Sequence, residues 1–321
     1  MSINRAHVLI ISPALAEANN GNWQTAWRWQ HLLRPQFRAS IASQWQGEPA
    51  DAMLALHARK SADSVLAWAQ AKGSEQLALV LTGTDLYRDI QTDPSAQRAL
   101  QLAGQLVLLQ ERAPDALPES LRHKAQVIFQ SAPRRATLGK TYLHLRALMV
   151  GHLRDEKDPL TYLRAAARLA FRTDIYLDHI GDALDPALGQ AAQLAAQNCP
   201  QYRWLGGLTH AQTRNRIQRA HVLVHPSKME GGAQVILEAV QSGTPVLASR
   251  IDGNVGMLGP HYAGYFALGD DAALAQLLQR CRDDADFLPL LRLQCAARAA
   301  LFEPQREQAL LRALVAKLAA A

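Results

Sequence analysis

Short apolar runs alternate with segments of helical spacing along most of the chain, and this alternation constrains the fold more than any other feature. In the first half, strand-length runs stand at His7–Ser12, Ala39–Ser43, Met53–His57, Leu77–Thr82, Leu106–Gln110 and Val127–Gln130. Several are followed by segments with apolar residues every three or four positions. Strands that alternate with helices in this way predict an α/β fold with a parallel, doubly wound sheet.

The second half repeats the same cycle. Strands are expected at Ala147–Val150, Ile175–His179, Tyr202–Leu205, Val222–His225, Pro245–Ser249 and Tyr265–Leu268. Helices are expected at Pro159–Ala170, Pro186–Asn198, Thr209–Ala220, Gly232–Gln241 and Ala272–Arg282. Proline and glycine break the pattern between Ala132 and Arg146, which predicts a linker there. We expect two domains, residues 1–140 and 141–321, with the last helix crossing back between them.

Composition excludes several classes of protein. Hydrophobic residues make up 49% and charged residues 19% of the 321 positions, as in folded globular chains. No stretch of about 18 apolar residues predicts a membrane helix, and the first residues lack a secretory pattern, so a cytoplasmic protein is expected. Cys199, Cys281 and Cys295 show no C-x-x-C spacing, which favours buried free thiols over a disulfide framework or a zinc site.

The net charge of +6 raises the question of an anionic partner. The basic residues are scattered and form no run of about five, and no basic and aromatic alternation follows a strand, so nucleic-acid binding is not predicted. A small anionic substrate explains the charge equally well. The segment Leu138-Gly139-Lys140-Thr141 ends like a phosphate-binding P-loop, but Arg134 stands where the first glycine belongs, and the match is attributed to chance.

The strongest motif begins at the end of the strand expected at Val222–His225. Glu230 precedes the pair Gly231-Gly232, and Glu238 follows two helical turns later. Glycine allows a backbone to approach a ligand, and a helix start favours anions such as phosphate. The two carboxylates can then bind hydroxyls at different points of one extended ligand. A solvated helix face is the alternative interpretation of Glu238 alone.

This Glu-x7-Glu pattern, with Gly-x-Pro-Val downstream, resembles glycosyltransferase family 4 and its GT-B relatives. The resemblance implies two Rossmann-like domains that face a central cleft, with Glu230 on the transferred sugar and Glu238 on the ribose. Relatives commonly carry Gly-Arg after the first strand of the second domain and a Lys five residues after that Arg. Gly151 and Lys157 match, whereas His152 replaces the Arg.

The departure at His152 leaves one cation of the family pattern to be supplied elsewhere. Arg154 is the candidate substitute, because a guanidinium binds phosphate oxygens in pairs. An exposed charged segment from Arg154 to Lys157 is the alternative. Such cations stabilise a departing nucleoside diphosphate in place of a metal ion, so neither a metal nor another cofactor is expected. The acidic run Asp283–Asp286 is interpreted as a surface turn.

Three stretches of the first domain follow expected strands and should therefore line the ligand crevice. They are the polar loop Pro13–Thr25, the segment Leu56–Ser61 and the segment Thr82–Asp89. The candidate residues for binding the acceptor are Asn20, Gly21, His57, Arg59, Lys60, Thr84, Asp85 and Arg88.

These stretches, together with Gly151–Pro159, resemble the selenosugar synthases of selenoneine biosynthesis. The resemblance implies a donor that is UDP-N-acetylglucosamine or UDP-glucose and an acceptor that is selenophosphate, giving a 1-seleno-sugar after phosphate is lost. Ionised selenium needs no general base, so the cations Arg59, Lys60 and Arg88 would suffice. A hydroxyl acceptor would need a base, for which His57 or Asp85 could serve. A family 4 transferase of that kind and a UDP-sugar 2-epimerase remain the alternatives.

Overall fold

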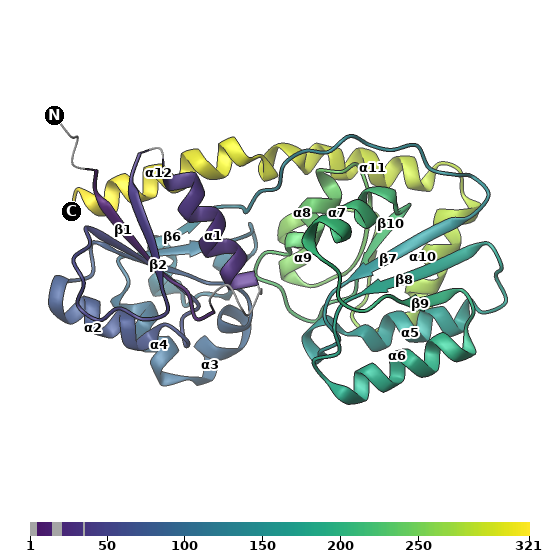
Figure 1. Ribbon diagram of the computed structural model, residues 1–321, viewed down its shortest axis with the longest axis horizontal. Coiled ribbons are helices and arrows are strands. Elements are labelled where there is room, and N and C mark those ends of the chain that lie inside the picture. Colours follow the sequence, from purple (N-terminus) through teal and green to yellow (C-terminus); the bar gives the residue numbers. More distant parts are fainter. Residues whose placement is uncertain (1–4, 15–20, 35) are drawn as a thin grey trace. The chain divides into compact units, whose positions relative to one another are not determined.

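The computed structural model describes residues 5–14, 21–34 and 36–321, and these divide into two compact units (Figure 1). The first unit contains residues 1–130 together with 304–321, and the second contains residues 131–303. The described residues form two sheets of six strands, and all the strand pairs are parallel. This confirms the prediction of an α/β fold with two parallel sheets.

The first sheet has the strand order β2-β1-β3-β4-β5-β6. Its strands are β1 (His7–Ile11), β2 (Arg38–Ala42), β3 (Ala52–Leu56), β4 (Leu77–Val80), β5 (Gln105–Leu108) and β6 (Ala125–Val127). The helices of this unit are α1 (Gly21–Leu33), α2 (Ala62–Lys72), α3 (Ile90–Thr92), α4 (Pro94–Leu102) and α12 (Pro304–Ala319).

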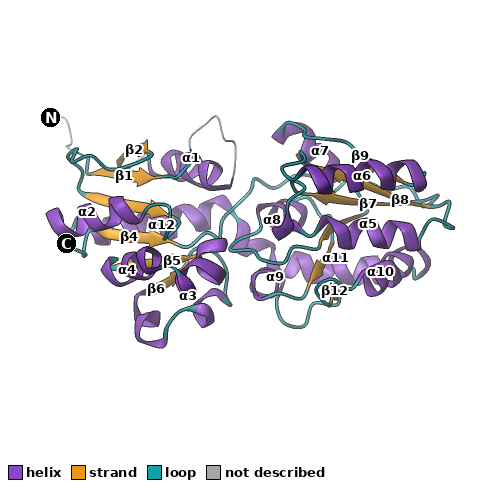
Figure 2. Cartoon of the chain, turned by 90° about the horizontal axis from the view of Figure 1, so that it is seen from below, coloured by secondary structure: helices purple, strands orange, loops and turns teal. Residues whose placement is uncertain are grey.

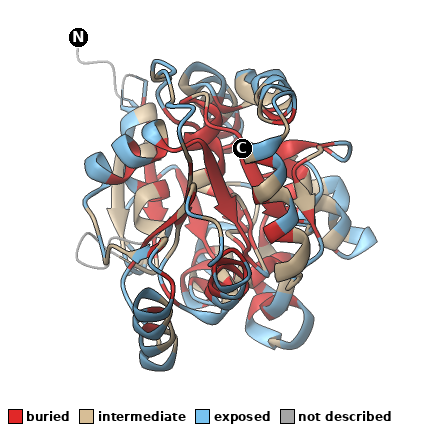
Figure 3. Cartoon of the chain, turned by 90° about the vertical axis from the view of Figure 1, so that its right-hand side faces the viewer, coloured by how far each residue is buried: buried red, intermediate tan, exposed pale blue. Residues whose placement is uncertain are grey.

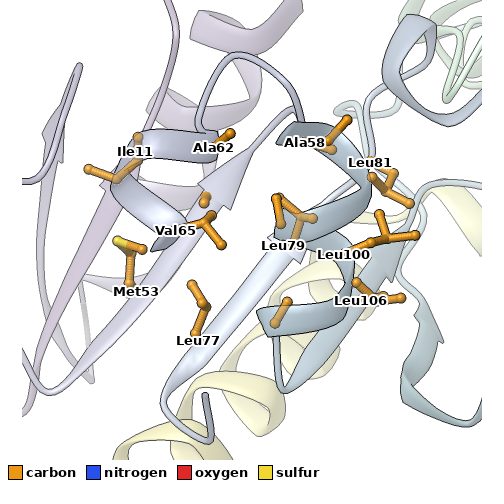
Figure 4. Packing of buried hydrophobic residues seen from close by; sticks show 14 of the residues in the cluster. Ile11, Met53, Ala58, Ala62, Val65, Leu77, Leu79, Leu81, Leu100 and Leu106 are labelled. Carbon is orange, nitrogen blue, oxygen red and sulfur yellow. The ribbon is translucent and has the colours of Figure 1, made fainter. Parts of the chain in front are cut away.

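Alternate residues of these strands belong to two hydrophobic cores on opposite faces of the sheet, because successive side chains of a strand point to opposite faces. On one face, Leu77 and Leu79 pack with Val65 of α2 and Leu100 of α4 (Figure 4). On the other face, neighbouring strand residues such as Leu54 pack against α1 and α12. Helices thus cover both faces, which is why these strands read as continuous apolar runs.

The second sheet has the order β12-β11-β10-β7-β8-β9. Figure 2 labels β7, β8, β9 and β12 among its strands. Its strands are β7 (Leu145–Val150), β8 (Ile175–Ile180), β9 (Tyr202–Trp204), β10 (Val222–His225), β11 (Val246–Ser249) and β12 (Tyr265–Phe266). Its helices are α5 (Pro159–Arg168), α6 (Pro186–Asn198), α7 (His210–Arg219), α8 (Gln234–Val240), α9 (Asp252–Leu258), α10 (Asp271–Asp283) and α11 (Phe287–Arg298). Figure 3 shows buried residues in the strands and exposed residues on the outer faces of the helices.

Every strand expected from the sequence is present, although β6 begins and ends earlier than the run Val127–Gln130 suggested. The loop expected from Pro13 to Thr25 is shorter than proposed, because α1 already begins at Gly21. The units also differ from the expected domains of 1–140 and 141–321. The division falls after Gln130, and α12 belongs to the first unit.

Specific contacts hold α12 on the first unit. Glu307 is buried and accepts hydrogen bonds from Trp29 Nε1, at 2.7 Å, and from Arg28 Nε. Leu311 and Leu314 pack in the core beneath α1. The helical periodicity of the last residues was visible in the sequence, but the surface that this helix covers was not.

The structure also describes the three cysteines and the lengths of the helices. Cys199, Cys281 and Cys295 are buried free thiols, as predicted. Among the helices of the described ranges, none combines the length and the apolar character needed to cross a membrane.

Candidate functional site

The loops that follow β7 and β10 meet, because these two strands are neighbours and run in parallel. Lys157 follows β7 and Glu230 follows β10, and Lys157 Nζ lies 2.5 Å from Glu230 Oε1. His225 Nε2 lies 3.1 Å from the same oxygen, although it is not oriented for a hydrogen bond. Burial alone would raise the pKa of Glu230, but Lys157 and His225 outweigh it and hold the pKa well below its ordinary value. Glu230 is therefore an ionised, buried carboxylate.

Further contacts fix the two loops against one another. The backbone N–H of Lys228 donates to the carbonyl oxygen of Glu156 at 2.9 Å, and Lys228 Nζ pairs with Asp155 at 2.5 Å. A Cβ atom at Gly253 would lie 2.1 Å from the carbonyl oxygen of Glu230, so only glycine lets α9 pack this closely behind the carboxylate. The Lys157–Glu230 pair thus has a defined geometry.

Residues in and just after the neighbouring strand β8 contact the carbonyl oxygen of Gly151. Its carbonyl oxygen accepts a hydrogen bond from His179 Nε2 at 3.2 Å, while His179 Nδ1 accepts from the hydroxyl of Tyr202 at 3.0 Å. Burial lowers the pKa of His179 to about 4, so the ring is neutral. A Cβ atom at Gly181 would overlap the same carbonyl oxygen at 2.0 Å. His179 and Gly181 therefore position the Gly151 turn.

The structure describes both His152, which replaces the arginine of the family pattern, and Arg154, the candidate substitute for its charge. His152 Nδ1 accepts the backbone N–H of Asp182 at 3.1 Å. Burial, together with the charges of Arg154 and Lys157, lowers the pKa of His152 despite the opposing effect of Asp182. A neutral His152 cannot replace an arginine as a charge. Arg154 is about half exposed, and its Nε lies 4.0 Å from Glu156, which leaves the guanidinium able to reorient.

Glu238 lies on α8 and is buried, with 2% of its surface exposed, so the alternative of a solvated helix face is wrong. His210 Nε2 of α7 lies 2.7 Å from its Oε1, and Arg214 Nη1 lies 3.8 Å from that oxygen. Gly231 and Gly232 form the bend before α8, and neither has a positive φ angle. Neither His210 nor Arg214 was identified from the sequence, because α7 is distant along the chain.

In the first unit, Asp85 joins the loops that follow β3 and β4. Its carboxylate is fully buried and accepts the backbone N–H groups of Ala58, Thr82 and Gly83, each at 2.9 Å. These bonds occupy both oxygens. Asp85 therefore stabilises the loops, and the interpretation of this carboxylate as a candidate base loses support.

His57 is the more unusual residue of this edge. It is buried and has a φ of 74°, a left-handed conformation that costs energy in a residue with a Cβ atom. Its Nε2 lies 3.2 Å from Thr84 Oγ1, and its Nδ1 accepts a long 3.4 Å contact from the amide of Lys60. Burial lowers the pKa of His57, which Asp85 and Asp89 oppose only in part. The ring is neutral, with two carboxylates about 4 Å away.

The three candidate cations for the acceptor differ in how far a carboxylate already balances their charge. Arg59 Nε and Arg88 Nε both pair with Asp89, at 2.9 and 3.2 Å, so part of their charge is already balanced. Lys60 is exposed and has no ion pair among the residues that the structure describes. Gly21 is the first residue of α1, and Asn20 lies outside the described residues.

Within the described ranges, no three or more His, Cys, Asp or Glu side chains gather in a way that could hold a metal ion. The acidic run that begins at Asp283 is bound to arginines instead. Asp283 pairs with Arg172, and Asp284 accepts from Arg280 Nε at 3.0 Å. This arrangement agrees with the expected surface turn between α10 and α11.

Solved structures of known enzymes resemble the whole chain. A sucrose-phosphate synthase from Thermosynechococcus elongatus superimposes with a TM-score of 0.80 at 16% identity, covering 98% of this chain and 100% of that one. Anabaena HepE in complex with UDP-glucose gives a TM-score of 0.74 at 13% identity, covering 97% and 99%. At these identities the likeness defines the fold, which is the GT-B arrangement of two Rossmann-like units.

Sequence comparison finds similarity to glycosyltransferases, mainly in the second unit. Residues 143–298 match the family model described as glycosyl transferases group 1. The chain is 32% identical over 114 residues to glycosyltransferase 1 domain-containing protein 1 of Xenopus tropicalis, which covers 35% of this chain and 33% of that protein. It is 30% identical over 171 residues to D-inositol 3-phosphate glycosyltransferase of Streptomyces coelicolor, covering 49% and 37%. The chain spans only about a third of the length of these two relatives, and its second unit is similar to the glycosyl transferases group 1 family over residues 143–298.

Proposed function

We propose that this chain is a glycosyltransferase that takes a sugar from UDP-N-acetylglucosamine or UDP-glucose without the help of a metal ion. The observation that carries this proposal is the pair between the partly buried Lys157 and the buried Glu230 at the carboxyl edge of the second sheet. The buried carboxylate of Glu238 on the following helix supports it. The names of solved structures with the same fold include complexes with UDP and UDP-glucose.

The ion pairs of the second unit suggest how a donor would bind. A diphosphate offers Lys157 a stronger partner than Glu230, and Arg154 is exposed enough to bind the same group. Glu230 is then free to accept a hydrogen bond from a sugar hydroxyl, and it remains ionised because its pKa is held low. Glu238 would similarly exchange His210 for the ribose hydroxyls. As the bond between C1 and the diphosphate oxygen breaks, the electron pair leaves with UDP and the two cations stabilise it.

For the acceptor we propose selenophosphate. The proposal rests on the resemblance of the segments between residues 12 and 159 to selenosugar synthases and on the cations Arg59, Lys60 and Arg88. A lone pair of the ionised selenium forms the bond to C1 while UDP departs, and water then removes the phosphate. This step needs no base, because the nucleophile carries its charge at neutral pH.

The geometry of His57 favours a second candidate, which is transfer to a hydroxyl. Nδ1 of this neutral ring accepts only the long contact from Lys60, so it could take a proton, and Asp85 Oδ2 lies 4.0 Å from it to stabilise the charged form. The curated relatives named D-inositol 3-phosphate glycosyltransferase suggest a hydroxyl acceptor that also bears a phosphate. Such an acceptor would use both the cations and the histidine.

The test is incubation with each UDP-sugar, with and without selenophosphate, followed by mass spectrometry of the products. Release of UDP together with a selenium-bearing sugar supports the selenophosphate proposal. UDP release only with an alcohol such as an inositol phosphate supports the hydroxyl acceptor. An isomerised UDP-sugar formed without an acceptor would identify a 2-epimerase and overturn both. Turnover that is lost on exhaustive chelation and restored by magnesium would refute the metal-independent mechanism.

A further inference from the structure

A cavity of about 650 Å³ lies in the second unit, and its lining includes none of the proposed donor-site residues. Its walls come from the segment before β7, from His221 just before β10, and from the region where α10 passes into α11. It includes Lys140, in the segment that resembles the end of a P-loop. The proposed function does not use any of these residues.

The position of the cavity separates it from the proposed donor site. Leu145, the first residue of β7, lines the cavity, whereas Gly151 follows the last residue of the same strand. Six residues of strand span roughly 20 Å, at about 3.3 Å each. The cavity therefore lies at the amino edge of the sheet and the donor site at the carboxyl edge.

Charges at the cavity are not balanced. Asp284 is the acidic residue among those lining it, and its carboxylate already accepts from Arg280 Nε and from the N–H of Asp286. Arg282 lies 2.7 Å from Asp174. Among the described residues, Lys140 and Arg292 have no carboxylate partner: Lys140 Nζ donates to the carbonyl oxygen of Gln218, and Arg292 Nε is buried without a hydrogen-bond partner.

Burial and the nearby positive charges also affect two titratable residues that line the cavity, Lys140 and His221. Burial, together with the charges of Arg292 and Arg219, lowers the pKa of Lys140 to about 8. His221 Nδ1 accepts the N–H of Arg146, and its Nε2 donates to the carbonyl oxygen of Thr141, so this ring is a neutral structural group. An anion in the cavity would pair with the two unbalanced cations.

We propose that this cavity binds a small organic phosphate, with Lys140 and Arg292 on the phosphate group. A phosphate fits better than a carboxylate, because its two negative charges and three oxygens match a lysine and an arginine fork. The remaining volume is lined in part by Leu138, Leu288 and Pro289, which suit an apolar portion of the ligand. The site is independent of the donor site at the other edge of the sheet.

The experiment is calorimetric titration of the full chain with phenyl phosphate, in the presence of saturating UDP to occupy the donor site. We expect one binding event per chain, weaker binding of benzoate and of inorganic phosphate, and at least a tenfold loss of affinity in Lys140→Gln and in Arg292→Gln. Arg216→Gln is the matched control, since Arg216 is exposed on α7 and outside the cavity, and it should bind as the unaltered chain does.

Thermal denaturation of each variant shows whether it is folded, and the two substitutions are made separately so that one folded variant suffices. Absence of binding to the unaltered chain, or equal affinity in the folded variants and in the control, overturns the proposal. Inorganic phosphate that binds as tightly as phenyl phosphate would also contradict it, because the apolar wall would then contribute nothing.

Discussion

The carboxyl edges of the two sheets use buried carboxylates in different ways. In the second unit, Glu230 and Glu238 are partnered by side chains, namely Lys157 and His210. In the first unit, Asp85 is partnered by three backbone N–H groups. A side-chain partner can be exchanged for a ligand by rotation about its bonds, whereas a backbone partner cannot move without moving a loop. Glu230 and Glu238 therefore have exchangeable partners, as does Asp89 of the first unit, which pairs with Arg59 and Arg88, whereas Asp85 belongs to a fixed framework.

The largest effect that tests this comparison is expected at Glu230. Glu230→Gln removes the charge that pairs with Lys157 but keeps the shape of the side chain, so turnover should fall by about 100- to 1,000-fold. The melting temperature should change much less than turnover. Both are measured on the same preparation, by UDP release and by thermal denaturation. A Gln variant with near-normal turnover would show that the Lys157–Glu230 pair is structural.

Asp85 should behave in the opposite way. Asp85→Ala leaves three buried N–H groups without an acceptor, which we expect to lower the free energy of unfolding by about 3 kcal/mol or more. Asp85→Asn keeps an acceptor oxygen and should cost less. Urea denaturation measures both values. If Asp85→Ala proved as stable as the unaltered chain, the carboxylate would not be what holds the two loops together.

Substitution of Glu238 tests whether this carboxylate exchanges its partner His210 for the ribose hydroxyls of UDP. Glu238→Ala should weaken UDP binding by about 1.5–3 kcal/mol, the usual value for hydrogen bonds to a charged acceptor. His210→Ala is the control, since it removes the partner that the ligand would displace, and UDP should bind this variant at least as tightly. Calorimetry measures both affinities. Unchanged affinity in Glu238→Ala would remove the ribose assignment.

The sequence was sufficient to predict the two parallel sheets. Strands buried on both faces read as apolar runs, which made them recognisable. The resemblance to family 4 assigned Lys157 and Glu230 to one donor, but their contact at 2.5 Å comes from the structure. Which sheet α12 covers could not be predicted, because its periodicity gives a buried face but not its partner. The hydrogen bonds by which Asp85 stabilises two loops could not be predicted either. Bonds from a side chain to backbone N–H groups produce no recognisable pattern of residue spacing in the sequence.

Substitutions of His57 test whether the backbone of the loop after β3 is strained at this residue. A left-handed φ of 74° costs little for glycine, so His57→Gly should be more stable than His57→Ala by about 1 kcal/mol. The difference between the two variants, measured in urea, isolates the backbone because both lack the imidazole. Equal stabilities would mean that the loop relaxes to another conformation. Transfer to selenophosphate should survive in the better-folded variant, while transfer to a hydroxyl should not.

The smallest expected effect concerns Lys140, at the amino edge of the second sheet. Its pKa is about 8 in the folded chain and about 10.5 when unfolded, so the unfolded chain binds the extra proton between these values. Folding stability should therefore rise with pH from about 8 to 10.5, relative to the variant Lys140→Met, in which this proton is absent. The full shift corresponds to roughly 3 kcal/mol, of which solvent screening at this half-buried amine should leave a fraction. Urea denaturation of both chains at several pH values measures the difference. Adding phenyl phosphate should flatten the rise, because an anion beside Lys140 favours the charged amine, and a rise that persists unchanged with the ligand bound would place that ligand elsewhere.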